Sequence, residues 1–272
     1  FINKTSIKNY RRYGVTRIQI GVQHYDDSIL KKINRQCYTK DTIRAIRLLK
    51  QVGLKVVVHL MPDLPGSNPD LDKWMFNVAI NNSDLQFDDV KIYPTAVCKP
   101  HNENIILTSK IAEWYQQKTY IPYAEKDINL LIDVIRHYLV NIKPWVRVQR
   151  CIRDIPGCSI EVGYQKKSNL RQMIQETIDK RNEKTYEIRT MEVRESEYLN
   201  FPGRLVVRKY IASKGIEYHI SMEAYKDNYT AYFKYYLILA LNFLKSFFSY
   251  NENFYWAGSK NYVALFGFLR LR

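Results

Sequence analysis

Three short strand patterns, each followed by a helical pattern, constrain the fold of this chain more than any other feature. Thr16–Val22 alternates with a period of two, as a strand does. Lys55–Leu60 is a nearly continuous apolar run, which suits a strand buried on both faces, and Val90–Tyr93 predicts a third strand. The strands begin about 35 to 40 residues apart. This spacing is typical of the βα units of a parallel sheet or barrel.

Helical patterns fill the gaps between these strands. Asp26 or Asp27 can cap a short helix, and Lys40–Val52 predicts a longer one that Gly53 ends in a left-handed conformation. Asp70–Asn81 and Asp127–Asn141 predict two more, the latter with apolar residues on one face. Because parallel sheets need cover on both faces and protected edges, we expect further strands upstream of Phe1.

The pattern changes after Trp145, where we expect no further βα unit. A basic stretch leads into a helix over Leu170–Arg181, and strands without intervening helices follow. We expect these strands at Arg189–Glu195, Leu205–Tyr210, Glu217–Glu223 and Val263–Leu271, with the chain continuing beyond Arg272. Tyr229–Trp256 fits no single helical face well and is predicted to be an insertion in this α+β region, with a core helix or an unstructured segment as the alternatives.

Charge indicates the class of binding partner, and cysteine content indicates the redox state of the compartment. Lys and Arg number 42 against 27 Asp and Glu, a net charge of +15 that favours an anionic partner, nucleic acid before membrane. Without a run of about 18 uncharged apolar residues, no spanning helix is expected. Cys37, Cys98, Cys151 and Cys158 follow no framework spacing, which predicts free thiols in a reduced compartment.

Several motifs, in order along the chain, carry a resemblance to a known family. They are Gly14–Gln23 (GVTRIQIGVQ), Asn34-Arg35, Gly53–Pro65 (GLKVVVHLMPDLP), Val90–Thr95 (VKIYPT), Pro144–Arg150 (PWVRVQR), Arg153–Pro156 (RDIP) and Ile188–Val193 (IRTMEV). Together they closely resemble the catalytic subunits of the Elongator complex, from about residue 8 to 223 and again over 265–272.

The resemblance implies an α/β fold: the C-terminal part of a radical S-adenosylmethionine (SAM) partial (βα) barrel, followed by the beginning of an α+β GNAT-like acetyltransferase domain. We place the barrel portion at residues 1–145, a basic interdomain tRNA-binding segment at 146–187 and the acetyltransferase-like start at 188–272, with the insertion at 229–256. Family members use acetyl-CoA and radical SAM chemistry to acylate C5 of the wobble uridine of tRNA. The same resemblance implies a cytoplasmic location, with the nucleus as the alternative. It also implies tRNA and other Elongator subunits as partners, and no membrane association.

This sequence departs from the family pattern in two places. No closely spaced cysteine triplet occurs to hold a 4Fe-4S cluster, and no Gln/Arg-x-x-Gly-x-Gly/Ala loop opens a helix to hold acetyl-CoA. We therefore expect the ligands of the cluster and of SAM to lie largely outside this chain, which would be inactive alone. A catalytically dead RNA-binding remnant of the family is the alternative. A radical enzyme of the anaerobic coproporphyrinogen oxidase branch, which shares Gly-Val-Gln, is a more distant one.

Cofactor-binding candidates cluster after the predicted strands, where ligands of parallel sheets bind. The resemblance assigns Gln23 and Arg35 to the methionine and ribose of SAM, while a structural hydrogen-bonded pair is the alternative. His59 and Asp63 follow the second strand and could line the same pocket or belong to the core. No serine–histidine–aspartate triad, paired carboxylates or zinc site can be placed.

Catalytic and RNA-binding candidates lie further along. Lys91 and Tyr93 alternate on the third strand and therefore share a side, where the family places a Lys and a Tyr near the reaction centre; outward Lys and packed Tyr is the alternative. For RNA phosphates we single out a run of cations, as against a solvated basic face. They are Arg147, Arg150, Arg153, Lys166 and Lys167.

Overall fold

The structure is a computed structural model that describes residues 2–99, 109–152, 155, 159–164, 169–192, 203–224 and 267–271. These residues fall into two compact units. The first holds the described residues up to Met191 together with Ile211–Ile216, and the second holds most of the remainder.

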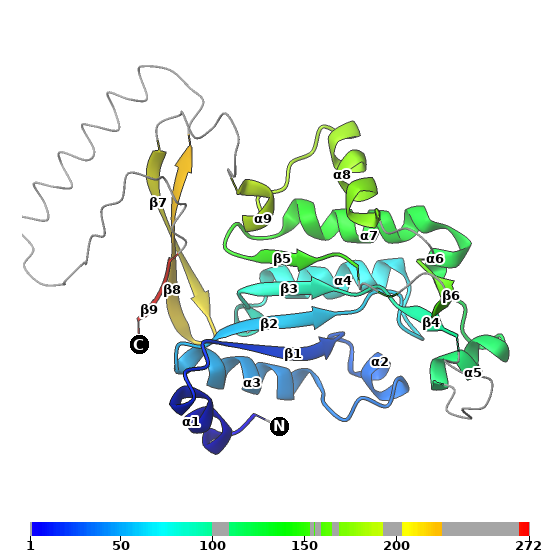
Figure 1. The fold of residues 1–272 in the computed structure, drawn as a ribbon, viewed down its shortest axis with the longest axis horizontal. Coiled ribbons are helices and arrows are strands. Elements are labelled where there is room, and N and C mark those ends of the chain that lie inside the picture. Colours follow the sequence, from blue (N-terminus) through cyan, green and yellow to red (C-terminus); the bar gives the residue numbers. More distant parts are fainter. Residues whose placement is uncertain are drawn as a thin grey trace, which may run out of the picture. The chain divides into compact units, whose positions relative to one another are not determined.

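A parallel sheet organises the first unit (Figure 1). Its strands β1 (Arg17–Gln23), β2 (Lys55–Leu60) and β3 (Asp89–Ile92) pair in that order, as the βα pattern predicts. The expectation of no further βα unit after Trp145 is wrong, because β5 (Arg147–Arg150) pairs in parallel with β3. Val148 is the only apolar residue of β5, which leaves too little periodicity to reveal a strand.

Helices connect these strands close to their predicted bounds. They are α2 (Asp27–Lys32), α3 (Thr39–Gln51), α4 (Pro69–Asn81), α7 (Ile128–Asn141) and α8 (Leu170–Lys180). The Asp26 side chain accepts from the Ser28 and Ile29 N–H groups, which confirms it as a helix cap. Gly53 has φ of +72°, the left-handed conformation expected after α3.

The remaining elements of the first unit were not predicted. They are α1 (Lys4–Arg12), η1 (Ser83–Leu85), α5 (Lys110–Gln116), α6 (Tyr123–Lys126), α9 (Ile188–Met191) and the antiparallel pair β4 (Ala96–Cys98) and β6 (Ile160–Gly163). Each has nine residues or fewer, which is too short for a clear apolar period. The predicted strand Arg189–Glu195 is wrong, because α9 covers its start. There the buried Glu187 carboxylate accepts the Arg189 N–H and the Thr190 hydroxyl, which favours a helical turn.

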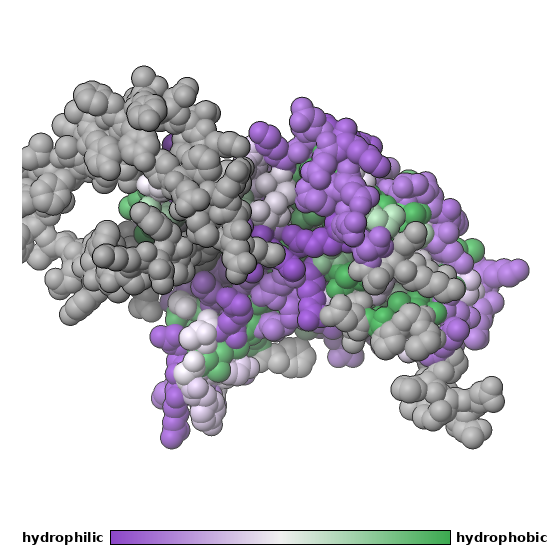
Figure 2. Space-filling view, turned by 45° about the horizontal axis from the view of Figure 1, so that its top comes forward, coloured by the Kyte–Doolittle hydropathy of each residue, from purple (hydrophilic) through white to green (hydrophobic). Residues whose placement is uncertain are grey.

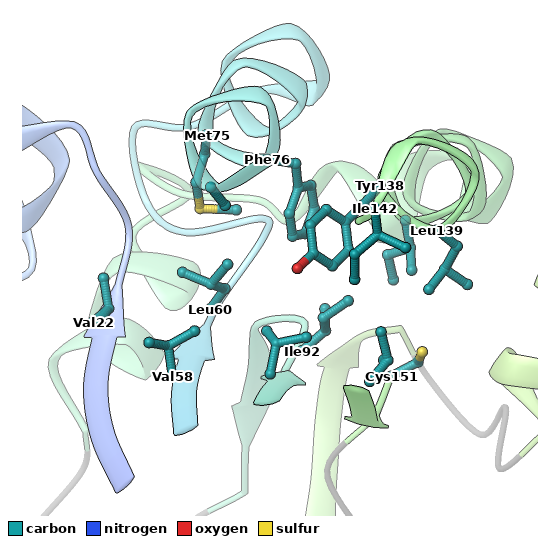
Figure 3. Close-up of a cluster of buried hydrophobic side chains, with 14 of the residues drawn as sticks. Val22, Val58, Leu60, Met75, Phe76, Ile92, Tyr138, Leu139, Ile142 and Cys151 are labelled. Atoms are coloured by element: carbon teal, nitrogen blue, oxygen red, sulfur yellow. The ribbon is translucent and has the colours of Figure 1, made fainter. Parts of the chain in front are cut away.

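The helices seal one face of the sheet. Val58, Leu60 and Ile92 point from the strands toward Phe76 of α4 and Tyr138 of α7, whose rings stack at 4.5 Å (Figure 3). Burying each such side chain stabilises the fold by about 1.5–3 kcal/mol. Hydrophilic residues cover most of the described surface in Figure 2. Polar chemistry is therefore left to the other face of the sheet and to its ends.

A second sheet lies largely in the second unit and has the order β7 (Gly203–Ala212), β8 (Gly215–Ala224) and β9 (Gly267–Leu271). It confirms the strands predicted at Leu205–Tyr210 and Glu217–Glu223, and β9 covers the end of Val263–Leu271. The predicted insertion at 229–256 lies outside the described residues.

Candidate functional site

A row of polar residues crosses the open face of the parallel sheet. Strand register places Gly21 of β1 beside His59 of β2, His59 beside Lys91 of β3, and Lys91 beside Arg150 of β5. The apolar residues that alternate with His59 on β2 belong to the core. The alternation that buries one face therefore places Gly21, His59 and Lys91 on the other, whereas Arg150 comes beside Lys91 through a register shift between β3 and β5.

Gln19 connects two of the predicted site residues. Its Oε1 accepts from Lys91 Nζ at 2.8 Å and lies 3.1 Å from His59 Nε2. The His59 ring meets Tyr93 edge to face, with centroids 5.3 Å apart. The structure therefore brings Lys91, Tyr93 and His59 together, and Lys91 and Tyr93 are half-buried rather than outward or fully packed.

Gln23 and Arg35 meet at the end of β1. An Arg35 guanidinium nitrogen donates to the Gly21 carbonyl. A Cβ added at Gly21 would lie 2.8 Å from Arg35 Nη2 and 3.0 Å from Gln23 Nε2, so that any larger residue would push these side-chain ends away. Gln23 has φ of +73°, a left-handed conformation that turns the chain at the strand end. Residues twelve positions apart are thus brought into one cluster.

This cluster has the properties of a polar ligand site. Gln23 Oε1 and Arg35 Nε are both buried and have no hydrogen-bond partner in the described residues. Such atoms cost free energy unless a ligand or water satisfies them. An amide oxygen and a guanidinium suit the hydroxyl and carboxylate groups of SAM. The end of β1 therefore fits this cofactor.

Radical SAM domains bind an iron–sulfur cluster, and the described residues provide no site for one. No group of three or more His, Cys, Asp or Glu side chains there could hold a metal ion. Cys37, Cys98 and Cys151 form no disulfide within this part of the chain, and burial raises the pKa of Cys151 to about 11. The described residues therefore do not fit a 4Fe-4S cluster.

Asp63 supports the loop after β2 rather than facing a ligand. Its two carboxylate oxygens accept the N–H groups of Tyr123 and Ala124 at 2.9 and 3.0 Å, and its carbonyl accepts the Tyr120 hydroxyl. Asp63 is 1% exposed, and burial raises its pKa to about 7, assisted by the nearby charge of Asp72. The possibility that Asp63 lines the pocket is thus replaced by a structural role.

Asp72 joins this loop to β1 and was not singled out from the sequence. Its Oδ2 accepts the Asp63 N–H and the Tyr123 hydroxyl, both at 2.7 Å, and its Oδ1 accepts the Ser67 hydroxyl at 2.5 Å. His24 Nε2 lies 3.3 Å from the same Oδ1, an electrostatic contact without hydrogen-bond alignment. The buried carboxylate thereby fixes the segment that follows Gln23.

The predicted basic segment divides into cations with different roles. Arg147 and Arg150 lie on β5, and Arg150 is exposed. Arg171 is instead used internally, because it pairs with the buried Glu187 at 2.7 Å and donates to the Val148 carbonyl. Arg181 lies 3.8 Å from Asp133. The candidates Arg153, Lys166 and Lys167 lie outside the described residues.

Gln19, His24, Asp72 and Glu187 are the site and support residues that sequence reasoning missed. Gln19 alternates with Gly21 and Gln23 on β1, which is a signal that could have found it. The partners of Asp72 and Glu187 come from distant segments, so no local pattern marks these acids.

Known proteins resemble the chain along most of its length. Residues 2–75 match the Radical SAM superfamily model, and residues 87–180 match the Radical_SAM C-terminal domain. A tRNA uridine(34) acetyltransferase of Methanocaldococcus infernus is 36% identical over 234 residues, covering 84% of this chain and 42% of that protein. Elongator complex protein 3 of Saccharomyces cerevisiae is 30% identical over 227 residues, covering 82% and 39%.

A solved structure supports the same relationship. Archaeal Elp3 of Methanocaldococcus infernus with an N-terminal deletion (1–46) superposes with a TM-score of 0.72 at 35% identity, covering 82% of this chain and 51% of that one. The expected radical SAM fold with a parallel sheet is confirmed, and the GNAT-like part stays a prediction. The chain spans less than half the length of the curated relatives cited. Within the described residues, no helix is long and apolar enough to cross a bilayer.

Proposed function

We propose that this chain, which belongs to the radical SAM superfamily, is part of a protein that acylates C5 of uridine 34 in tRNA. It matches tRNA uridine(34) acetyltransferases along most of its length. Acetyl-CoA is the proposed acyl donor. The described chain contributes Gln23, Arg35 and His59 to the SAM site, and other subunits of an Elongator-type complex are its proposed partners.

The cluster of Gly21, Gln23 and Arg35 carries this proposal. Gln23 Oε1 and Arg35 Nε are buried without partners among the described residues at the end of a parallel strand, where ligands of such sheets bind. Arg35 would hold the carboxylate of SAM, Gln23 its hydroxyls, and His59 the adjacent part of the molecule. When bound together with an iron–sulfur cluster, SAM supplies one-electron chemistry.

Lys91 and Tyr93 are the proposed catalytic residues. Both lie on the open face of the sheet, and His59 lies between this pair and the end of β1. Gln19 orients the Lys91 ammonium through its single accepting oxygen. Lys91 can hold an anionic group of a substrate there, and Tyr93 can donate or accept a proton through its hydroxyl.

SAM binding to the full chain tests the proposal by isothermal titration calorimetry. Arg35→Lys removes the planar fork while keeping the charge and should weaken SAM binding at least about tenfold, about 1.4 kcal/mol. Arg44→Lys is the matched control, because Arg44 is exposed on α3. Equal affinity of Arg35→Lys and Arg44→Lys would contradict the assignment of this edge to SAM.

The tRNA substrate is proposed to contact Arg147 and Arg150 of β5, together with Arg153, Lys166 and Lys167. The net charge of +15 supports an RNA partner. Replacing Arg147 and Arg150 by Ala should weaken tRNA binding and flatten its salt dependence by roughly 0.7–0.9 for each phosphate that is no longer neutralised. An unchanged slope in a salt titration would exclude β5 as part of the tRNA-binding surface.

A further inference from the structure

Helix α1 carries a stripe of cations that the proposed site does not use. Its nine residues include Lys4, Lys8, Arg11 and Arg12, and none of the nine is acidic. The spacing of four, seven and eight residues from Lys4 places the four side chains within about a third of the helix circumference. All four are exposed. Together with the neighbouring Tyr13, we call this surface the α1 stripe.

The cations of the α1 stripe have no acidic partner in the described residues, whereas several other cations of the first unit do. Arg136 pairs with Asp133 and Glu183, and Arg171 pairs with Glu187. Lys50 forms a buried ion pair with Asp88 at 2.9 Å. In these pairs a carboxylate of the folded chain neutralises the cation. The like charges of the α1 stripe instead repel one another. Such a surface is stabilised by an anionic ligand.

The stripe is held rigidly. The Asn3 side chain accepts the Ser6 N–H at 2.8 Å, and the Ser6 hydroxyl accepts the Asn3 N–H at 2.9 Å, which closes a capping box at the start of α1. Ile7 is 6% exposed and packs in the core, with Ile2 and Tyr10 against it. Rigid placement lowers the entropy cost of binding a ligand.

Tyr13 points to RNA as the ligand. It directly follows Arg11 and Arg12, and at 77% exposure its side chain is the most exposed of the large hydrophobic residues described. Cations beside an exposed aromatic ring are the combination that binds single-stranded nucleic acid, through phosphate contacts and stacking on a base. We propose that the α1 stripe binds the phosphate backbone of an RNA, with an unpaired base stacked on Tyr13.

The structure argues against an acidic membrane as the alternative partner. Helices that bind membranes insert an apolar face beside their cations. The apolar residues of α1, Ile7 and Tyr10, pack instead against the protein core. The stripe can therefore offer a membrane only charge and one aromatic ring.

The inference builds on the proposed tRNA substrate but concerns a surface distinct from β5. The test measures binding of a tRNA transcript to the full chain between about 50 and 200 mM salt. In the stripe variant Lys4, Lys8, Arg11 and Arg12 are replaced by Gln, which keeps helix propensity. The control variant replaces four exposed lysines by Gln elsewhere, for the same change in net charge: Lys31, Lys99, Lys118 and Lys126.

We expect the stripe variant to bind at least about tenfold more weakly at the lower salt, with a slope flattened by roughly 0.7–0.9 for each phosphate that is no longer neutralised. The control should change both much less. Tyr13→Ala should weaken binding of a single-stranded RNA, whereas Tyr13→Phe should retain it, since phenylalanine still stacks. If the fourfold variant fails to fold, Lys8→Gln and Arg12→Gln replace it.

Three outcomes would overturn the inference. Equal weakening in the stripe and control variants would show that only net charge matters. Loss of binding to phosphatidylserine vesicles with tRNA binding intact would assign the stripe to a membrane. If the unmodified chain binds no tRNA, the proposed substrate fails as well. If it binds tRNA and the stripe variant matches the control, only the inference about α1 fails.

Discussion

The His24 ring lies with Nε2 3.3 Å from Asp72 Oδ1, and both side chains are fully buried. His24 Nδ1 accepts the Asp26 N–H at 2.9 Å, so the ring proton of a neutral imidazole must sit on Nε2, facing the carboxylate. This contact connects the residue that follows Gln23 to α4. Asp72 also accepts three hydrogen bonds, from the Asp63 N–H and the Tyr123 hydroxyl at Oδ2 and from the Ser67 hydroxyl at Oδ1, beside the His24 ring.

Replacing Asp72 by Asn should therefore destabilise the chain substantially. An amide has one accepting oxygen. If it replaces Oδ1, the Asp63 N–H and the Tyr123 hydroxyl lose their acceptor, and if it replaces Oδ2, the amide NH2 group faces the Ser67 hydroxyl and His24 Nε2. Each buried donor left unsatisfied costs about 1–3 kcal/mol. Urea unfolding measures the loss. Asp70→Asn, an exposed change on the same helix, is the control, and equal stability of the two variants would contradict the network.

Asp63 should make stability depend on pH in the opposite direction to an ordinary ion-paired carboxylate. Burial raises its pKa to about 7, so the folded chain holds a proton that the unfolded chain releases near its ordinary pKa of about 4. The stabilisation from this bound proton is fully present below the unfolded-state pKa of about 4. It is lost as pH rises from there through the folded-state pKa of about 7, at up to about 1.4 kcal/mol per pH unit.

Urea unfolding between about pH 5 and pH 8 measures this dependence. Asp63→Asn cannot titrate, so its stability should fall less over that range than that of the unmodified chain. Asp70→Asn should retain the full dependence. Parallel profiles for the unmodified chain and Asp63→Asn would show that Asp63 keeps a similar pKa in both states.

The sequence predicts the parts of this fold that rest on periodic apolar residues. Val56–Val58 reveals β2 because three adjacent apolar residues, all of them buried, are typical of a strand inside a parallel sheet. β5 escapes because the residues around Val148 are polar and are stabilised by pairing with β3 and by Glu187, which accepts the Val148 N–H. Strand formation there depends on distant residues rather than on local pattern.

The sequence also predicts only part of the candidate site. Motif position placed Gln23 and Arg35 together, and the structure shows that Gly21 permits their approach. Asp63 could not be assigned from its position after a strand, because its partners Tyr123 and Ala124 lie about sixty residues away. Which polar residue faces a ligand and which supports a loop is decided by these tertiary contacts.

Gly21→Ala should separate SAM binding from folding. The backbone at Gly21 has no positive φ, so alanine is tolerated there, and the added methyl meets the ends of the Arg35 and Gln23 side chains. Those ends can move, and we expect a stability change of under about 1 kcal/mol but a loss of SAM affinity of at least about tenfold.

In an Arg35→Ala background the methyl group has room, so Gly21→Ala should cost little further affinity. Calorimetry on the two single variants and the double variant measures this coupling. Fully additive losses would mean that Gly21 and Arg35 act on SAM independently, against the geometry of this cluster.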